Sequence, residues 1–152
     1  MTRKLVWIKG NTGSGKSTIP IQMLQTSKDY VEYDDYCTVF HRCLTVAAGK
    51  YLPGKITANG CDQLRTVANT KDAIEHAIRT YPTYNVIFEG MMISTIKSTF
   101  YEFMLEMGEK YDIELIIVVM KTTAQGCINR LATRGTSRKP PKRDNIRKYT
   151  DQ

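Results

Sequence analysis

Short apolar runs alternate along this chain with longer stretches in which apolar residues recur at every third or fourth position. Four runs read as strands, at residues 4–8, 30–35, 85–90 and 113–120. Four stretches read as amphipathic helices, at residues 16–27, 71–80, 94–110 and 123–135. Strands that alternate with helices predict an α/β fold, in which a parallel sheet of four or five strands carries helices on both faces.

Each helical stretch presents an apolar face that we expect to pack on the sheet. These faces comprise Ile19, Met23 and Leu24 on the first, Ile74, Ala77 and Ile78 on the second, and Ile96, Phe100, Phe103, Met104 and Met107 on the third. Asn69 or Thr70 is the expected cap of the second helix. Residues 36–70 are rich in glycine and turn residues and predict a loop or a small insertion, whereas 113–120 predicts a buried strand.

The composition fits a single domain spanning residues 1–152. Apolar residues make up 41% of the chain and charged residues 24%, which are ordinary values for a globular protein. No apolar run reaches the roughly 18 residues that span a membrane, and no signal peptide is evident, so we expect a cytoplasmic protein. The four cysteines and two histidines form no CxxC pair and no zinc-binding spacing, so we expect reduced thiols and no zinc.

The net charge of +7 is concentrated near the carboxyl terminus. Residues 121–152 hold nine basic and two acidic side chains, whereas residues 1–120 hold 13 of each kind. Such a segment attracts phosphates, either free or within a polymer, but a solvated basic tail has the same composition. Charge alone leaves both interpretations open.

The segment between the first strand and the first helix matches the P-loop pattern at every fixed position. Gly10 is followed after four residues by Gly15, Lys16 and Ser17. The predicted ATP-binding residues are Gly10, Asn11, Thr12, Gly13, Ser14, Gly15, Lys16, Ser17 and Thr18. The glycines leave backbone amides free to point at phosphate oxygens, and the start of the helix adds a positive dipole end. Lys16 would bridge the β- and γ-phosphates, and Ser17 would place its hydroxyl on Mg²⁺. The sequence therefore predicts a three-layer sandwich of the P-loop type that binds ATP and Mg²⁺.

Carboxylates end two of the predicted strands, Asp34 and Asp35 the second and Glu89 the third. Ligands of parallel sheets lie beyond the carboxyl ends of the strands, and phosphoryl transfer to a hydroxyl needs a base and a contact to Mg²⁺. Neighbouring strand residues point to opposite faces, so only one of the two aspartates can line the site. We predict Asp34 as the catalytic base and Glu89 as a ligand of Mg²⁺ or of its water. Asp35 is either a surface acid or an acceptor contact.

Arg130 and Arg134 are four residues apart near the end of the last predicted helix, which Gly135 would terminate. Two guanidinium groups aimed at one place suit the charge that spreads over a transferring phosphoryl group. Kinases carry such arginines on a short lid that excludes water, so we predict an arginine-rich lid at about 128–143 and catalytic roles for both arginines. Two solvated arginines on an exposed helix face are the alternative.

Four segments occur in the order and approximate spacing found in the kinase domain of bacteriophage polynucleotide kinase, which this chain resembles. They are GNTGSGKST, YDDY, VIFEG and RLATRGT, at residues 10–18, 33–36, 86–90 and 130–136. The resemblance implies that Asp34 deprotonates the accepting hydroxyl and that Arg130 and Arg134 are lid arginines. Tyr33 and Cys37 stand where that family has arginines around the two acids, so a contact to a 5′-hydroxyl acceptor is missing.

A second resemblance is to small phage P-loop kinases, including those that phosphorylate 5-hydroxymethyluracil within DNA. The matching segments are GKY, GCDQL and FEG, at residues 49–51, 60–64 and 88–90. The resemblance implies acceptor contacts by Tyr51 and Asp62, and action in the host cytoplasm. Tyr51 is either a stacking partner for a base or, as we favour, an ordinary tyrosine of the core or of a loop. An ordinary surface loop would also account for the first two segments.

The leading hypothesis is an ATP- and Mg²⁺-dependent kinase that phosphorylates a hydroxyl on nucleic acid, such as the hydroxymethyl group of 5-hydroxymethyluracil in phage DNA. Three alternatives remain: a polynucleotide 5′-hydroxyl kinase, a kinase for a nucleotide or another metabolite, and a P-loop ATPase without a hydroxyl acceptor. The paired arginines argue against the ATPase. The sequence leaves open GTP as donor, although it contains no guanine-specific NKxD motif, and it leaves open the oligomeric state.

Overall fold

A six-stranded mixed sheet forms the centre of the molecule in the computed structural model, which describes residues 2–11, 13–27, 30–53, 60–90 and 97–133. The strands are β1 (Lys4–Lys9), β2 (Val31–Tyr33), β3 (Cys37–Phe40), β4 (Thr45–Ala48), β5 (Asn85–Glu89) and β6 (Glu114–Val119), in the order β2-β3-β4-β5-β1-β6. Strands β4, β5, β1 and β6 pair in parallel, whereas β3 is antiparallel to both of its neighbours. The expected parallel sheet of four or five strands is therefore confirmed only in part: four strands are parallel, but the sheet has six strands and its β2–β3–β4 part is antiparallel.

The antiparallel part of the sheet comes from the segment that the sequence predicted as a loop. Residues 36–70 contribute β3 and β4, together with the 3-10 turns η2 (His41–Cys43) and η3 (Cys61–Leu64). Each of these strands has only four residues, and all of their side chains are buried. Such short, wholly buried strands show neither the alternation nor the length that identifies a strand from sequence.

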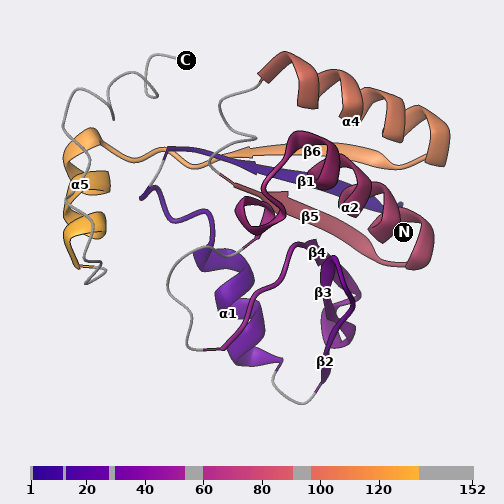
Figure 1. The fold of residues 1–152 in the computed structure, drawn as a ribbon, viewed down its shortest axis with the longest axis horizontal. Helices are drawn as coiled ribbons and strands as arrows, with labels where there is room; N and C mark the ends of the chain where they lie inside the picture. Colours follow the sequence, from indigo (N-terminus) through magenta and orange to yellow (C-terminus); the bar gives the residue numbers. More distant parts are fainter. Residues whose placement is uncertain (1, 12, 28–29, 54–59, 91–96, 134–152) are drawn as a thin grey trace.

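Helices cover both faces of the sheet, as the sequence predicted (Figure 1). They are α1 (Thr18–Thr26), α2 (Val67–Thr80), α4 (Lys97–Tyr111) and α5 (Ala124–Thr133). α2 and α4 pack on one face, where Trp7 of β1 stacks on Phe88 of β5 with ring centroids 6.0 Å apart. α1 packs on the other face through Leu24, which joins a second core cluster with Phe40 and Tyr51. The result is a helix–sheet–helix sandwich.

The predicted apolar faces of α2 and α4 form the core, except that Ile96 lies outside the described residues; on the predicted face of α1, only Leu24 is buried, while Ile19 and Met23 are half-buried. Buried positions include Ile74, Ala77 and Ile78 of α2, and Phe100, Phe103, Met104 and Met107 of α4. The cap of α2 differs from the expected Asn69 or Thr70: the Thr66 side chain accepts a hydrogen bond from the Asn69 amide at 3.1 Å, and the helix begins one residue later. Threonine at this position satisfies one of the helix's unpaired amides.

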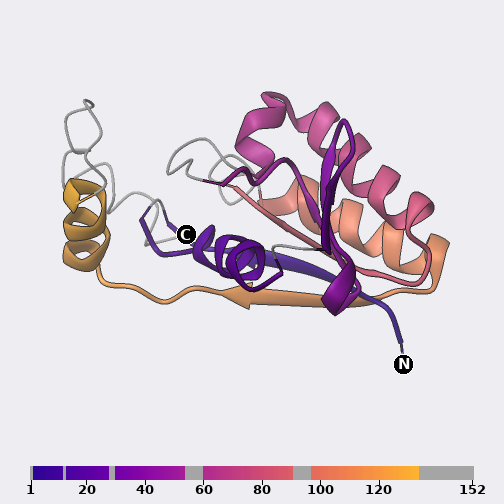
Figure 2. The ribbon, with the colours of Figure 1, turned by 90° about the horizontal axis from the view of Figure 1, so that it is seen from below.

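Strand β6 lies at the edge of the sheet and is only partly covered, contrary to the expected buried strand. Ile117 and Val119 are 42% and 57% exposed. Beyond β6 the chain runs to α5, which stands at one end of the molecule, apart from the other helices (Figure 2). Across the described ranges, every helix falls short of the length and apolarity that crossing a bilayer requires.

Candidate active site

The segment between β1 and α1 forms a tight loop with two glycines in the left-handed region. Gly13 has φ 82° and Gly15 has φ 94°, which residues with a Cβ rarely adopt. The Ser14 amide donates to the Asn11 carbonyl at 3.0 Å, and the Thr18 amide donates to the Gly15 carbonyl at 3.0 Å, so the loop leads directly into the first turn of α1. This conformation matches the predicted phosphate-binding loop. Thr12 lies outside the described residues.

The side chain of Lys16 folds back over this loop. Its ammonium group donates to the carbonyls of Gly10 and Asn11, both at 2.8 Å, and the residue is 6% exposed. The hydroxyl of Ser14 is buried in the same loop with no hydrogen-bond partner within the described part of the chain. A buried hydroxyl without a partner costs stability, which a ligand oxygen would recover.

A buried carboxylate connects the loop to the neighbouring strand. Ile8 of β1 pairs with Glu89 of β5, so both strands end at the same edge of the sheet. One carboxylate oxygen of Glu89 accepts hydrogen bonds from the Ser17 hydroxyl at 3.1 Å and from the Tyr51 hydroxyl at 2.5 Å. Parallel pairing of the strands thus brings together the two predicted metal ligands, which are 72 residues apart in sequence.

Burial determines the ionisation behaviour of this group. Glu89 is 2% exposed, and burial raises the pKa of its carboxyl, although the Tyr51 hydroxyl and the Lys16 charge partly offset that effect. Burial and the adjacent Glu89 charge raise the pKa of Tyr51 well above its ordinary value, so its hydroxyl remains a donor. Glu89 is held in place whether or not a cation is nearby.

Arg130 brings α5 to the phosphate loop. Its guanidinium donates to the Gly13 carbonyl at 3.5 Å, and it lies so close to Gly15 that a Cβ added there would be 2.8 Å from Nη1. The two figures that view the ribbon from different sides both show α5 at the same end of the molecule as this loop (Figures 1 and 2). One predicted lid arginine is therefore beside the loop; Arg134 and most of the predicted lid lie outside the described residues.

Two glycines, which the sequence indicated only through a resemblance, pack closely beside Tyr51 and Glu89 at this edge of the sheet. A Cβ on Gly49 would overlap the backbone of Gly60, and a Cβ on Gly60 would overlap the Tyr51 hydroxyl and lie 2.5 Å from Glu89 Oε1. Gly49 and Gly60 also have φ of 91° and 68°. A contact between residues 11 positions apart follows neither the helix period nor the strand period, so the sequence did not predict this packing. The resemblance had nevertheless singled out the two segments that contain these glycines, at residues 49–51 and 60–64.

Asp34, the predicted base, is placed elsewhere. The aspartate lies in the turn between β2 and β3, where Oδ1 accepts from the amides of Tyr36 at 2.8 Å and Cys37 at 2.6 Å. Oδ2 accepts from His76 Nε2 at 2.9 Å and from the Tyr81 hydroxyl at 3.0 Å. These four contacts hold the carboxylate against α2, and the geometry gives no support to its role as a base.

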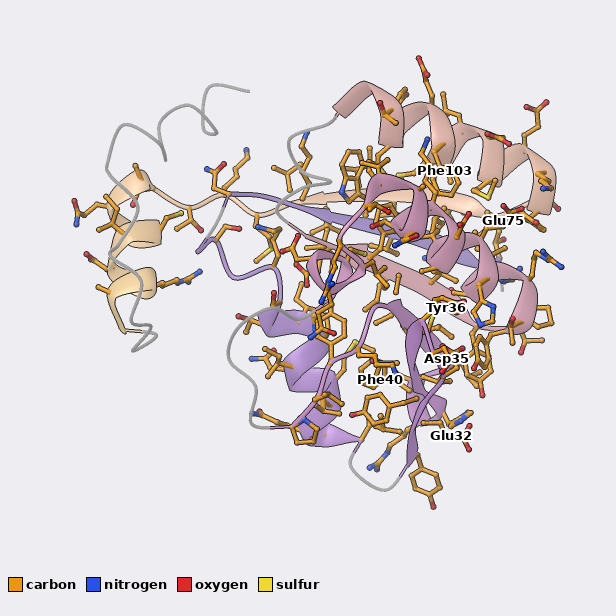
Figure 3. The ribbon with its side chains drawn as sticks, in the orientation of Figure 1. Glu32, Asp35, Tyr36, Phe40, Glu75 and Phe103 are labelled. Atoms are coloured by element: carbon orange, nitrogen blue, oxygen red, sulfur yellow. The ribbon has the colours of Figure 1, made fainter. Side chains whose placement is uncertain are left out.

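The remaining predicted acceptor contacts separate into three positions. Asp35 is exposed at the β2–β3 turn beside α2, on the side of the molecule away from α5 (Figure 3). Tyr51 is fully buried, so its ring cannot offer a face to a base and only its hydroxyl reaches the site. Asp62 is exposed at the start of η3, and a Cβ on Gly90 would lie 2.9 Å from its Oδ1. Of the three, Asp62 and the Tyr51 hydroxyl are next to the phosphate loop's edge of the sheet.

Replacing Asp34 with asparagine should destabilise the protein by about 1 to 3 kcal/mol, because the new amide would face the donors on His76 and Tyr81. Burial raises the pKa of Asp34, but the hydrogen bonds outweigh it and lower the pKa below its ordinary value. A lowered carboxyl pKa stabilises the fold above the unfolded pKa, and this stability is lost as pH falls through the folded pKa. The difference in the free energy of unfolding between the native protein and the variant, measured with urea, should therefore become smaller in acid.

Asp35→Asn, an exposed change in the same turn, is the matched control and should leave the unfolding midpoint unchanged. If the Asp34→Asn variant instead unfolds like the native protein but loses phosphoryl transfer, that result would support Asp34 as the catalytic base.

The arrangement fits a nucleotide bound with Mg²⁺. Within the described ranges, no three His, Cys, Asp or Glu side chains gather as a metal-ligand group. Mg²⁺ needs no such cage, since it commonly binds one or two protein oxygens together with substrate phosphates and water. Ser17 and Glu89 offer such oxygens, while the buried hydroxyl of Ser14 and the ammonium of Lys16 are suited to phosphate.

Comparison with known proteins gives a consistent family. A model of the 5-hmdU DNA kinase family matches residues 2–149. The 5-hmdU DNA kinase 1 of Salmonella phage ViI is 29% identical over 136 residues, which cover 86% of this chain and 59% of the relative. The 5-hmdU DNA kinase of Bacillus phage SP10 is 30% identical over 150 residues, which cover 95% of this chain and 22% of the relative. The chain thus spans less than two thirds of either relative, but the family model matches nearly all of it, and the chain belongs to the 5-hmdU DNA kinase family.

Proposed function

We propose that this chain is a kinase that transfers the γ-phosphoryl group of ATP to the hydroxymethyl group of 5-hydroxymethyluracil in phage DNA. The observation that carries the proposal is the convergence of Lys16 and Arg130 on one glycine loop, beside the buried pair of Ser17 and Glu89. The acceptor is inferred from the two relatives, which are named for 5-hmdU DNA and come from phages. Such an enzyme would act in the host cytoplasm, where phage DNA is made.

The donor side of the reaction rests on the phosphate loop. Its amides and the start of α1 would hold the phosphates, and Lys16 would exchange its two carbonyl partners for phosphate oxygens. The hydroxyl of Ser17 and the carboxylate of Glu89 would hold Mg²⁺, which supplies charge neutralisation between the β- and γ-phosphates. The hydrogen bond from Tyr51 keeps Glu89 oriented toward that position.

Arg130 would neutralise the charge that develops on the transferred group. Its guanidinium already lies over Gly15, so it needs little movement to contact a phosphate in the loop. We assign the same role to Arg134 on a lid at about 128–143, which would also exclude water from the transfer. The excess of basic residues after position 120 would hold the DNA backbone.

Labelled ATP offered with a set of acceptors tests this function. We expect transfer to duplex DNA that contains 5-hydroxymethyluracil and none to the same duplex with thymine, because only the former has the hydroxyl. Transfer should fall by roughly 10-fold or more between low and physiological salt, since basic side chains compete with cations for the DNA. Three results would point to the alternatives: labelling of 5′-hydroxyl oligonucleotides alone, labelling of free nucleotides with little salt dependence, or ATP hydrolysis without any labelled acceptor.

A further inference from the structure

Asp62 is an exposed residue at the carboxyl end of β5. Its carboxylate lies next to Gly90, the residue that follows Glu89. A Cβ added to Gly90 would be 2.9 Å from Asp62 Oδ1 and 3.4 Å from Cys61 Cβ, so η3 rests directly on the backbone that follows the strand. Since β5 and β1 end side by side, this is the same edge of the sheet at which the phosphate loop begins. Asp62 therefore lies at the edge of the sheet from which the phosphate loop begins.

The backbone around Asp62 is fixed by close packing. Gly49 and Gly60 touch through their backbones, and an isolated bridge pairs Lys50 with Gly60. Cys61 is fully buried, with its thiol directed to the Ala48 carbonyl at 3.8 Å. Each contact would be lost with a larger side chain at either glycine. The segment 60–62 thus presents Asp62 from a fixed support, which a catalytic group requires.

Burial separates the roles of the two acids at this edge. Glu89 is enclosed and is used by the hydroxyls of Ser17 and Tyr51, so a bulky acceptor cannot approach it directly. Asp62 is exposed, so it can contact an acceptor that enters from solvent and return a proton to water. The negative charge of Asp62 also helps to raise the pKa of Glu89, which is consistent with their closeness.

We infer that Asp62 is the general base of the phosphoryl transfer, a step that deepens the proposed function and rests on it. The oxygen of the acceptor hydroxyl forms a bond to the γ-phosphorus as the bond from that phosphorus to the β,γ-bridging oxygen breaks. ADP leaves with the electron pair of the broken bond, and the hydroxyl proton moves to the Asp62 carboxylate and then to water. Asp34, the base indicated by the sequence, is held by four donors in the β2–β3 turn and does not enter this step.

Asp62→Asn tests the inference, because it keeps the size of the side chain but removes the proton acceptor. Under single-turnover conditions with saturating 5-hydroxymethyluracil DNA and ATP, we expect the rate of transfer to fall by about 10²- to 10⁴-fold. Affinity for a fluorescent ATP analogue should stay unchanged, since Asp62 lies outside the phosphate loop, and the thermal midpoint of each variant shows whether the fold is kept.

Asp62→Glu and Asp72→Asn complete the comparison. Glutamate keeps the carboxylate and should recover part of the rate, whereas Asp72 is an exposed aspartate on α2 and its change should have no effect. A rate for Asp62→Asn within about fivefold of native, or a defect confined to the KM for DNA, would overturn the role of base. If the native enzyme labels a different hydroxyl, the proposed acceptor is wrong, and the role of Asp62 is then tested by measuring the same variants with the acceptor that is labelled. If the native enzyme labels no acceptor, both proposals fail.

Discussion

Replacing Lys16 with alanine should lower the rate of phosphoryl transfer by roughly 10³-fold, the largest loss that we expect from a substitution in the phosphate loop. The ammonium group lies over the phosphate loop and donates hydrogen bonds to two carbonyl oxygens. Without it, these partly negative oxygens would repel the phosphates of the nucleotide. In the transfer the ammonium group would follow the charge that moves onto the bridging oxygen, whereas Arg130 would act on the transferred group.

Initial-rate measurements with labelled ATP, together with nucleotide binding by fluorescence, provide the test. Lys4→Ala, an exposed lysine at the far end of β1, is the matched control and should keep full activity. Lys16→Arg tests whether positive charge alone is enough. Arginine keeps the charge but spreads it over a planar guanidinium group, which is larger than an ammonium group, so we expect only a small recovery of the transfer rate. Full transfer by a folded Lys16→Ala protein would contradict the whole assignment of the donor site.

Glu89→Gln should also lower the transfer rate strongly, and it should change activity and stability in opposite directions. The amide keeps an oxygen that can accept the hydrogen bonds from Ser17 and Tyr51, but it removes the charge that would attract Mg²⁺. We expect the transfer rate to fall by roughly 10²- to 10³-fold, with a higher requirement for Mg²⁺.

The stability of the same variant should move the other way. Burial raises the pKa of Glu89, so the folded protein binds more protons than the unfolded chain between the two pKa values. The nucleotide-free native protein should therefore lose stability as pH rises from the unfolded pKa through the folded one, and Glu89→Gln should lack this loss. Urea unfolding across this range without nucleotide checks the sign. A variant that is both active and less stable than native at high pH would contradict the reading of Glu89 as a buried, functional carboxylate.

The sequence by itself determined the local parts of this protein. The spacing of Phe100, Met104 and Met107 predicted a helix and the face that it buries. The helical period of 3.6 residues can be detected from residues that are close together in the sequence. The pattern from Gly10 to Ser17 predicted a phosphate loop, because its chemistry requires glycines and a lysine at fixed spacing. The sequence also singled out Glu89 and Arg130, and the structure places both beside that loop, Glu89 against Ser17 and Arg130 against Gly13.

The tertiary structure alone decided how the distant segments meet. Tyr51 and Glu89, 38 residues apart, share a hydrogen bond, and Asp34 lies against His76 across 42 residues. Neither contact leaves a local pattern, because each depends on the antiparallel insertion of β3 between β2 and β4. That insertion moved Asp34 to a turn against α2, while the close contact of Gly49 with Gly60 set Asp62 at the end of β5. The residues of the proposed phosphate loop are thus encoded locally, whereas strand order and backbone packing decide which carboxylates lie at the same edge of the sheet as that loop.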